Sequence, residues 1–254
     1  MKAKLAIRRE VKWVVSLLGL CALIAFAERK RGDIVCKDII VQLDNIQDNH
    51  FLSEAEALRI VESGQPQMRG KTFEEINLKE LEGKITYNKH VKDAELFTDL
   101  KGNLIVNVEL RRPIARLVQE DGPDAYIAED GTVMPVSENF SSRVLIISGN
   151  YVKTILDNEN LNNFDDGKQL LSMIEFINQD EFWRAQASQL DINSKGKIFI
   201  IPQVTSQTVE FGAPVNFETK FNKLKVFYKK ILPQMGWTKY RRVSVEFEGQ
   251  VIAE

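Results

Sequence analysis

Apolar side chains recur at every second position along residues 104–110, and together with the stretch before them they predict a β-hairpin near residue 100. Residues 91–97 form the first strand and residues 104–110 the second, where every other side chain is apolar. Residues 99–103 between them, Asp-Leu-Lys-Gly-Asn, supply the turn. A β-branched run at residues 39–43 predicts an earlier strand.

Two helices are predicted between that first strand and the hairpin. Ser53 with Glu56 fits a capping box at the start of a helix over residues 54–62, and Asn77 with Glu80 fits a second box. The second helix places Leu78, Leu81 and Ile85 on one face. The expected order of this module is therefore strand, helix, helix, strand, strand.

Arg112-Pro113 ends the first module, because proline lacks an amide donor and holds the residue before it in an extended conformation. The rest of the chain is richer in strands. Its predicted strands are residues 114–118, 125–128, 132–136, 143–147, 189–192, 198–201, 208–211 and 242–247, and its predicted helices are residues 170–177 and a long helix from Asn216 or Phe217 to about Leu232. The fold class is α+β, and the second module is a β-rich domain with a long C-terminal helix and a terminal strand.

An uncharged apolar segment runs from Trp13 to Ala27 near the N-terminus. As a helix it is about 22 Å long. Adding Val11 and Lys12, whose charged end can reach the membrane surface, brings it to roughly 17 residues, the lower limit for crossing a membrane. Three interpretations compete: a membrane anchor, a signal peptide cleaved after Ala25-Phe26-Ala27, and a buried core helix. We favour the uncleaved anchor, because a basic cluster at residues 29–31 is an unusual start for an exported mature protein. Its anchoring residues would be Trp13, Leu17, Leu20, Ile24 and Phe26.

The charge is divided unevenly around this segment. The whole chain has 34 Lys+Arg and 36 Asp+Glu, for a net charge of -2, but residues 1–12 hold five of the basic residues and one acidic residue. The body after the segment is therefore acidic, which argues against a general nucleic-acid binder. Because large domains cross the membrane largely regardless of flanking charge, we expect the body to lie outside the cytoplasm. The organisation predicted is a cytoplasmic tail (1–12), a transmembrane helix (13–27), a linker (28–36) and two domains (37–112 and 113–254).

No set of residues predicts a reaction. His50 and His90 lie far apart in the sequence and lack the spacing of a zinc site. The chain has no G-x-S-x-G or H-E-x-x-H motif, and the phosphate-loop-like residues 64–72 have five residues between the glycines where four are needed. We expect no catalytic residue, metal, cofactor or small-molecule substrate. The lysines along the last helix are interpreted as a solvent-exposed face rather than a site for an acidic partner; they are Lys220, Lys223, Lys225, Lys229 and Lys230.

Four motifs together resemble the FtsQ/DivIB family of bacterial cell-division proteins, and the resemblance covers nearly the whole chain. Residues 88–94 look like the strand after the family's second helix, and residues 102–108 resemble its hairpin. Residues 110–116, Leu-Arg-Arg-Pro-Ile-Ala-Arg, are similar to its Glu-Arg-x-Pro-Val-Ala junction, and residues 126–131 match its aromatic-x-x-x-Asp-Gly hairpin. The resemblance implies a single membrane helix, a polypeptide-transport-associated (POTRA) domain of βααββ order and a β domain.

The family resemblance also implies a function. Such a protein is a non-enzymatic scaffold at the division septum of the cytoplasmic (inner) membrane, with its body in the periplasm. It binds FtsB/DivIC-type and FtsL-type proteins, with the septal peptidoglycan synthase complex as a further partner, and so helps to regulate septal peptidoglycan synthesis. Two rival interpretations are an exported enzyme of unknown type and a POTRA-containing secretion factor, although the latter needs a β-barrel for which the chain has no room.

In that family a partner adds a β-strand beside the terminal strand. Val243, Val245 and Phe247 align with this strand, which includes Ser244, and Gly249 aligns with the small residue after it. A terminal strand can leave an unpaired edge whose amide groups accept another chain. The alternative, equally weighted, is that the three apolar side chains only fill the core.

Overall fold

The computed structural model describes residues 13–23, 34–45, 49–138 and 140–254. The chain forms two compact units. The first contains residues 1–43, 54–87 and 93–108, and the second contains residues 44–53, 88–92 and 109–254.

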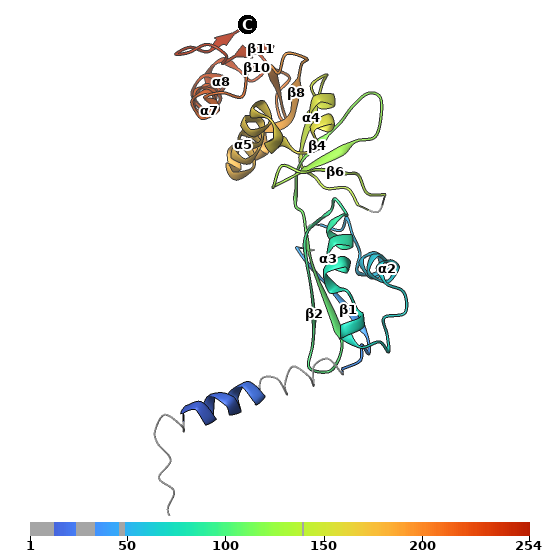
Figure 1. Ribbon diagram of the computed structural model, residues 1–254. Coiled ribbons are helices and arrows are strands. Elements are labelled where there is room, and N and C mark those ends of the chain that lie inside the picture. The colour runs from blue at the N-terminus through green and yellow to red at the C-terminus, as the bar shows by residue number, and fades with distance from the viewer. Residues whose placement is uncertain (1–12, 24–33, 46–48, 139) are drawn as a thin grey trace, which may run out of the picture. The chain divides into compact units, whose positions relative to one another are not determined.

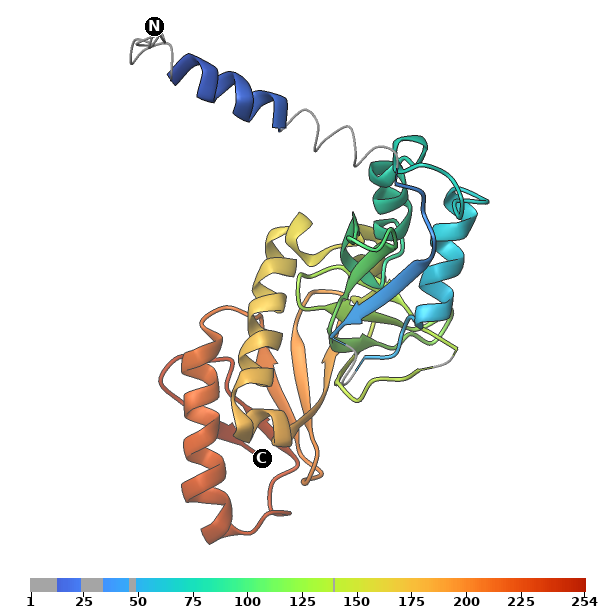
Figure 2. The same cartoon turned by 90° about the horizontal axis from the view of Figure 1, so that it is seen from below.

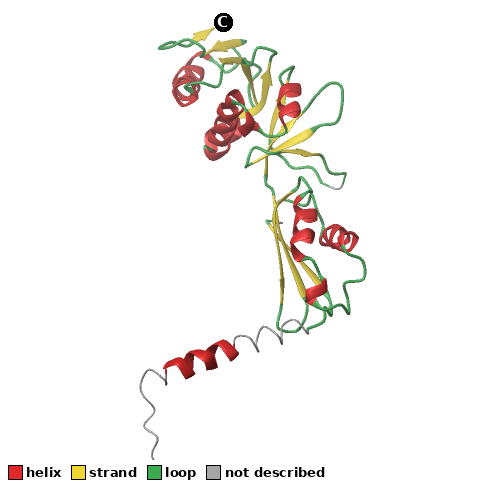
Figure 3. Ribbon diagram, in the orientation of Figure 1, coloured by secondary structure: helices red, strands yellow, loops and turns green. Residues whose placement is uncertain are grey.

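The first unit has the predicted order of strand, helix, helix, strand, strand. Its elements are β1 (Ile39–Asp44), α2 (Glu54–Gly64), the short 3-10 turn η1 (Phe73–Glu75), α3 (Leu78–Thr86), β2 (Val91–Thr98) and β3 (Leu104–Leu110). The strands form one sheet in the order β1-β3-β2, and α2 and α3 cover one face of it (Figure 3). The alternation in β3 follows from this arrangement, because Leu104, Val106 and Val108 are completely buried.

The predicted cap of α3 is confirmed, with one change. The Asn77 side-chain oxygen accepts a hydrogen bond from the Glu80 amide at 3.2 Å. In a capping box the Glu80 carboxylate would in turn accept from the Asn77 amide, but that amide donates to the side-chain oxygen of Gln65 at 3.2 Å. Glu80 accepts instead from the side-chain amide of Asn77 at 3.3 Å.

The second unit is built on a large mixed sheet (Figure 1). Among the described residues the strand order is β12-β11-β10-β9-β8-β7-β4-β5-β6. The strands are β4 (Pro113–Leu117), β5 (Ala125–Ala128), β6 (Val133–Pro135), β7 (Leu145–Ser148), β8 (Ala187–Ile192), β9 (Ile198–Pro202), β10 (Thr208–Gly212), β11 (Arg242–Ser244) and β12 (Ile252–Ala253). The helices are α4 (Val152–Asn158), η2 (Leu161–Asn163), α5 (Asp165–Gln179), α6 (Glu181–Gln186), α7 (Phe217–Val226), the π-helical turn η3 (Phe227–Ile231) and α8 (Leu232–Met235).

The two long helices lie on the same face of this sheet (Figure 2). They connect parallel strands, α5 between β7 and β8 and α7 between β10 and β11. Phe176 of α5 stacks on Phe221 of α7 with ring centroids 5.3 Å apart, and both helices pack on the main core of the unit. A smaller cluster on the opposite face contains Phe51, Tyr126 and Met134.

Several features differ from the sequence expectations. Helices α4 and α6 and strand β12 were not expected. The strand expected over residues 242–247 is β11, which is only three residues long. The last helix, expected to end at about Leu232, continues to Met235 and is capped by Gly236. Pro233 lies within this continuation, where a proline has no amide to donate and its ring clashes with the carbonyl four residues earlier. The wider π-helical turn η3 lies directly before α8, so the helix departs from regular α geometry next to Pro233.

The N-terminal apolar segment is described only in part. Residues 13–23 are helical, and Trp13, Leu17 and Leu20 are exposed on this helix. Ile24 and Phe26 lie outside the described residues, as do the predicted tail and residues 28–33 of the predicted linker. Within the described part of the chain, no helix has both the length and the apolar character needed to cross a membrane.

Gly167 gives a test of the packing at the start of α5. A Cβ atom there would lie 2.3 Å from the backbone oxygen of Leu161, so we expect Gly167→Ala to lower the free energy of unfolding by about 1–3 kcal/mol. Gly83 is the matched control, because a Cβ atom there meets nothing within 4 Å. Gly83→Ala should raise the stability of α3 by about 0.4–1 kcal/mol. Urea unfolding followed by circular dichroism measures both; a stable Gly167→Ala protein would contradict the packing described.

Candidate functional site

The residues predicted to bind a partner lie at the C-terminal end of the large sheet (Figure 1). Val243 and Val245 have no exposed surface and belong to the main core, as the alternative interpretation expected for them. Phe247 is different, because it is 52% exposed just after β11. Gly249 has a φ angle of +71°, a conformation that glycine adopts readily, and lies in the turn that reverses the chain.

Strand β11 does not form the edge that the sequence suggested. It pairs in parallel with β10 on one side, where Val243 lies opposite Val209. On its other side it pairs antiparallel with β12, where Ser244 lies opposite Ile252. The expectation of an open edge at Val243 and Ser244 is therefore corrected: the chain turns at Gly249 and returns, so that β12 is the outermost strand. Whether these residues bind a partner stays a prediction.

Lys223 of α7 holds the segment between β11 and β12. Its ammonium group donates hydrogen bonds to the backbone oxygens of Val245 at 3.1 Å and Phe247 at 2.5 Å, and lies 3.5 Å from that of Gln250. An ammonium group has three donors, so one side chain can satisfy several carbonyls of a tight turn. Lys223 was expected only on a solvent-exposed face of the helix. The return of the chain that Lys223 holds did leave a signal in the sequence: Gly249 followed by the apolar residues 251–253 is typical of a turn and a short strand.

The solvent-exposed face that was expected is found for Lys229 and Lys230 of η3 but not for the other lysines of α7. Lys220 is only 8% exposed, donates to the Ala213 oxygen at 2.8 Å and lies over the Phe211 ring. Its burial lowers the pKa of its ammonium group. Lys225 pairs with Asp180 at 2.8 Å, which ties α7 to the start of α6. These lysines therefore stabilise the fold, which reduces the charge available to an acidic partner.

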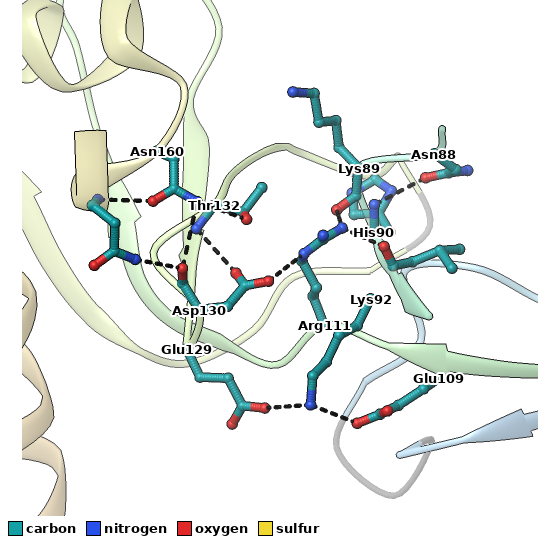
Figure 4. A network of polar contacts seen from close by, with 12 residues as sticks. Asn88, Lys89, His90, Lys92, Glu109, Arg111, Glu129, Asp130, Thr132 and Asn160 are labelled. Carbon is teal, nitrogen blue, oxygen red and sulfur yellow. Dashed lines mark hydrogen bonds and ion pairs between the residues drawn. The ribbon is translucent and has the colours of Figure 1, made fainter. Parts of the chain in front are cut away.

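A second arrangement joins two of the sequence motifs through an ion pair (Figure 4). Arg111 donates from its Nε atom to the Asp130 carboxylate at 2.8 Å, and its Nη1 atom donates to the backbone oxygens of Lys89 and Val91. The Asp130 carboxylate also accepts from the Thr132 amide at 3.0 Å. All of these residues belong to the second unit. The ion pair therefore fixes the start of β4 to the turn between β5 and β6.

The electrostatics of this network favour the charged state of Asp130. Burial alone would raise the pKa of its carboxyl group, but hydrogen bonds from Arg111 and Thr132 outweigh that effect and leave the pKa below its usual value. The side chains of Arg111 and Asp130 are 17% and 32% exposed, so water screens the pair less than it would on an open surface. Gly131 completes the turn with a φ angle of +80°, where a Cβ atom would lie 2.8 Å from the Asn162 side chain.

A cavity in the described part of the second unit contains one hydrogen-bonded pair of titratable groups. This cavity, of about 210 Å³, contains Tyr151, Asp166 and Lys195 in its lining. The Tyr151 hydroxyl donates to Asp166 at 3.3 Å, and burial together with this carboxylate raises the pKa of Tyr151. A protonated phenol bonded to a carboxylate supplies no activated nucleophile. Across the described residues, no three His, Cys, Asp or Glu side chains are grouped so that they could hold a metal ion.

Comparison with protein families gives two matches. A family described as FtsQ/DivIB, C-terminal related, matches residues 112–254, and a POTRA-like domain matches residues 34–109. No curated protein matches the chain. The first match covers more than half of the chain, and the two together cover both parts of the mixed α+β fold. The finer domain limits given above, residues 37–112 and 113–254, stay a prediction.

The Arg111–Asp130 pair predicts a pH-dependent stability. We expect Arg111→Met or Asp130→Asn to lower the free energy of unfolding at pH 7 by about 1–3 kcal/mol, because each leaves a partly buried charge without its counter-ion. The folded-state pKa of Asp130 lies below that of the unfolded chain, roughly 3.9. The contribution is therefore complete above about pH 4 and is lost as the pH falls through the folded-state pKa. Urea unfolding at pH 7 and pH 3 measures it. Asp121→Asn, at an exposed position, is the control and should change little at either pH. An equal effect of all three substitutions would contradict a stabilising role of the Arg111–Asp130 pair.

Proposed function

The chain belongs to the FtsQ/DivIB family of bacterial cell-division proteins, and from that premise we propose that it is a scaffold of the division machinery. It binds FtsB/DivIC-type and FtsL-type membrane proteins through its extracytoplasmic domains, with the septal peptidoglycan synthase complex as a further partner. Through these contacts it helps to assemble and regulate septal peptidoglycan synthesis. The family is one of division proteins without enzymatic activity, and the proposal accordingly assigns no reaction to the chain.

The observation that carries this proposal is that the large sheet ends, on its C-terminal side, in the two-residue strand β12. Sheet edges expose backbone donors and acceptors, and an extended segment of another protein can satisfy them by adding a strand. Here the end is formed by β11 and β12, and the exposed ring of Phe247 lies beside it. Val243 and Val245 contribute by holding β11 in the core, so the partner would contact mainly backbone groups and Phe247.

We also propose that the chain is anchored in the cytoplasmic membrane by its N-terminal apolar segment. The support is the uncharged run from Trp13 to Ala27 and the exposure of the apolar side chains on the described helical residues 13–23. In this arrangement residues 1–12 lie in the cytoplasm and the folded body lies in the periplasm at the division septum.

Partner binding at the sheet end is tested by Phe247→Glu. A charged side chain at this exposed position should leave the fold intact but abolish co-purification of the FtsB/DivIC-type protein of the same organism, because it introduces a charge beside an apolar contact. Val204→Glu is the matched control, since Val204 is an apolar residue of the same unit with 70% exposure. Equal co-purification by both variants would count against the proposed site. Ser244→Pro is less suitable, because β11 is paired on both sides and the fold itself would suffer.

Membrane anchoring is tested by the double substitution Leu17→Arg and Leu20→Arg. Each arginine near the middle of a membrane helix costs about 2.5–3.5 kcal/mol on insertion scales, so the protein should move from the membrane pellet to the soluble fraction. Leu100→Arg, at a position that is almost fully exposed in the turn between β2 and β3, should leave the distribution unchanged. Retention of the double variant in carbonate-washed membranes would contradict the anchor.

A further inference from the structure

Strand β12 occupies the side of β11 on which an added strand would lie. Beyond the paired residues, the Glu254 oxygen accepts from the amides of Arg241 at 2.7 Å and Arg242 at 3.2 Å, and the Glu254 amide donates to the Arg242 oxygen at 2.9 Å. The backbone groups that β11 would offer to another chain are therefore used by residues of the same chain.

Strand β12 is attached to β11 less strongly than β11 is attached to the core, because β12 buries less apolar surface. β12 has two residues, and Ile252 is 39% exposed while Ala253 is partly exposed. Val243 and Val245, in contrast, have no exposed surface. Because stabilisation scales with the apolar area removed from water, detaching β12 costs much less than detaching β11.

The fit between the two strands is also imperfect. Ser244 is only 7% exposed, and its hydroxyl oxygen is buried without a hydrogen-bond partner among the described residues. The residue directly opposite in β12 is Ile252, which has no polar group to offer. A buried polar group without a partner lowers stability, so a strand with a polar side chain opposite Ser244 would pair better than β12 does.

The outer edge of β12 is a poor template for a partner. In an antiparallel pair, alternate residues direct both backbone groups toward the neighbouring strand. Glu254 and Arg242 exchange both hydrogen bonds, which directs residues 252 and 254 toward β11 and leaves only Ala253 of the two-residue strand facing outward. β11, once uncovered, presents the groups of Arg242 and Ser244 together with the Arg241 amide.

From these observations we propose that residues Ile252–Glu254 are an intramolecular substitute for the partner strand, displaced when the partner binds. An extended segment of the partner then pairs antiparallel with β11 and places a polar side chain opposite Ser244. The turn stays attached, because Lys223 holds the carbonyls of Val245 and Phe247, and only residues 252–254 swing away. This inference rests on the proposed function and specifies how its binding site is regulated.

The proposal predicts opposite effects for two variants. A chain that ends at Val251 has no occupant to displace, and we expect it to bind the partner more tightly. If residues 252–254 are detached in about one molecule in ten, affinity should rise about tenfold, because apparent affinity scales with the fraction of the binding-competent state. Ser244→Cys with Ile252→Cys should do the reverse. Directly opposite residues that exchange hydrogen bonds have Cα atoms roughly 5.5 Å apart, within the range of a disulfide, so oxidation would lock β12 in place.

The experiment measures binding of the periplasmic segment of the same organism's FtsB/DivIC-type protein by calorimetry, with circular dichroism to verify folding. The reduced form of the double-cysteine protein is the control for its oxidised form, so the test survives if the shortened chain fails to fold. Hydrogen exchange adds a structural readout: on binding, the Glu254 amide should lose protection while that of Ser244 keeps it.

The outcomes separate this inference from the proposed function. Tighter binding by the shortened chain and weaker binding by the oxidised protein support displacement. Weaker binding by the shortened chain, with normal binding by the oxidised protein, would show that the partner adds outside β12; the inference is then wrong but the scaffold function stands. Absence of binding by the unaltered chain and all variants would instead overturn the proposed function itself.

Discussion

The central constraint on this chain is that its large sheet does not close, so the backbone groups of its last strands must find partners elsewhere. At the C-terminal end the chain meets this need with its own residues. Val243 and Val245 fix β11 in the core, Lys223 draws the following carbonyls together, and the return at Gly249 brings β12 alongside. The same backbone groups that require covering for stability are those that strand addition would use. Stability and partner binding therefore compete for one edge.

The Arg111–Asp130 pair shows why two motifs that are separate in the sequence occur together. Each motif alone describes a local structure, the approach to Pro113 or the hairpin turn at Gly131. In the fold the guanidinium group of one is the counter-ion of the other, and it also satisfies two backbone oxygens of residues 88–92. Loss of either charge would leave the remaining one partly buried without a counter-ion, so each motif stabilises the fold only when the other is present.

Most of the fold could be predicted from periodicity and turn residues, whereas the neighbours of each strand could not. The alternation in β3 and the cap at Asn77 were sufficient for the first unit, because they depend on local geometry. Strand β12 was missed because two residues carry no measurable period, and α6 because its six residues follow α5 almost directly. The role of Lys223 depends on three carbonyls more than twenty residues away, which no local pattern indicates.

At the candidate site, too, the neighbours of a strand could not be predicted from the sequence pattern. The apolar pattern at Val243 and Val245 correctly indicated a strand with one buried face, but a pattern of side chains reports faces and not edges. Whether a strand is outermost depends on which backbone pairs with it, and here that was decided by a glycine turn and a short return. Because strand addition is driven by main-chain hydrogen bonds, side-chain composition at such a site can vary while the geometry is kept. The identity of the residue opposite Ser244 would then be the main side-chain contribution to partner choice, since its buried hydroxyl is the one polar group of β11 that β12 leaves without a partner among the described residues.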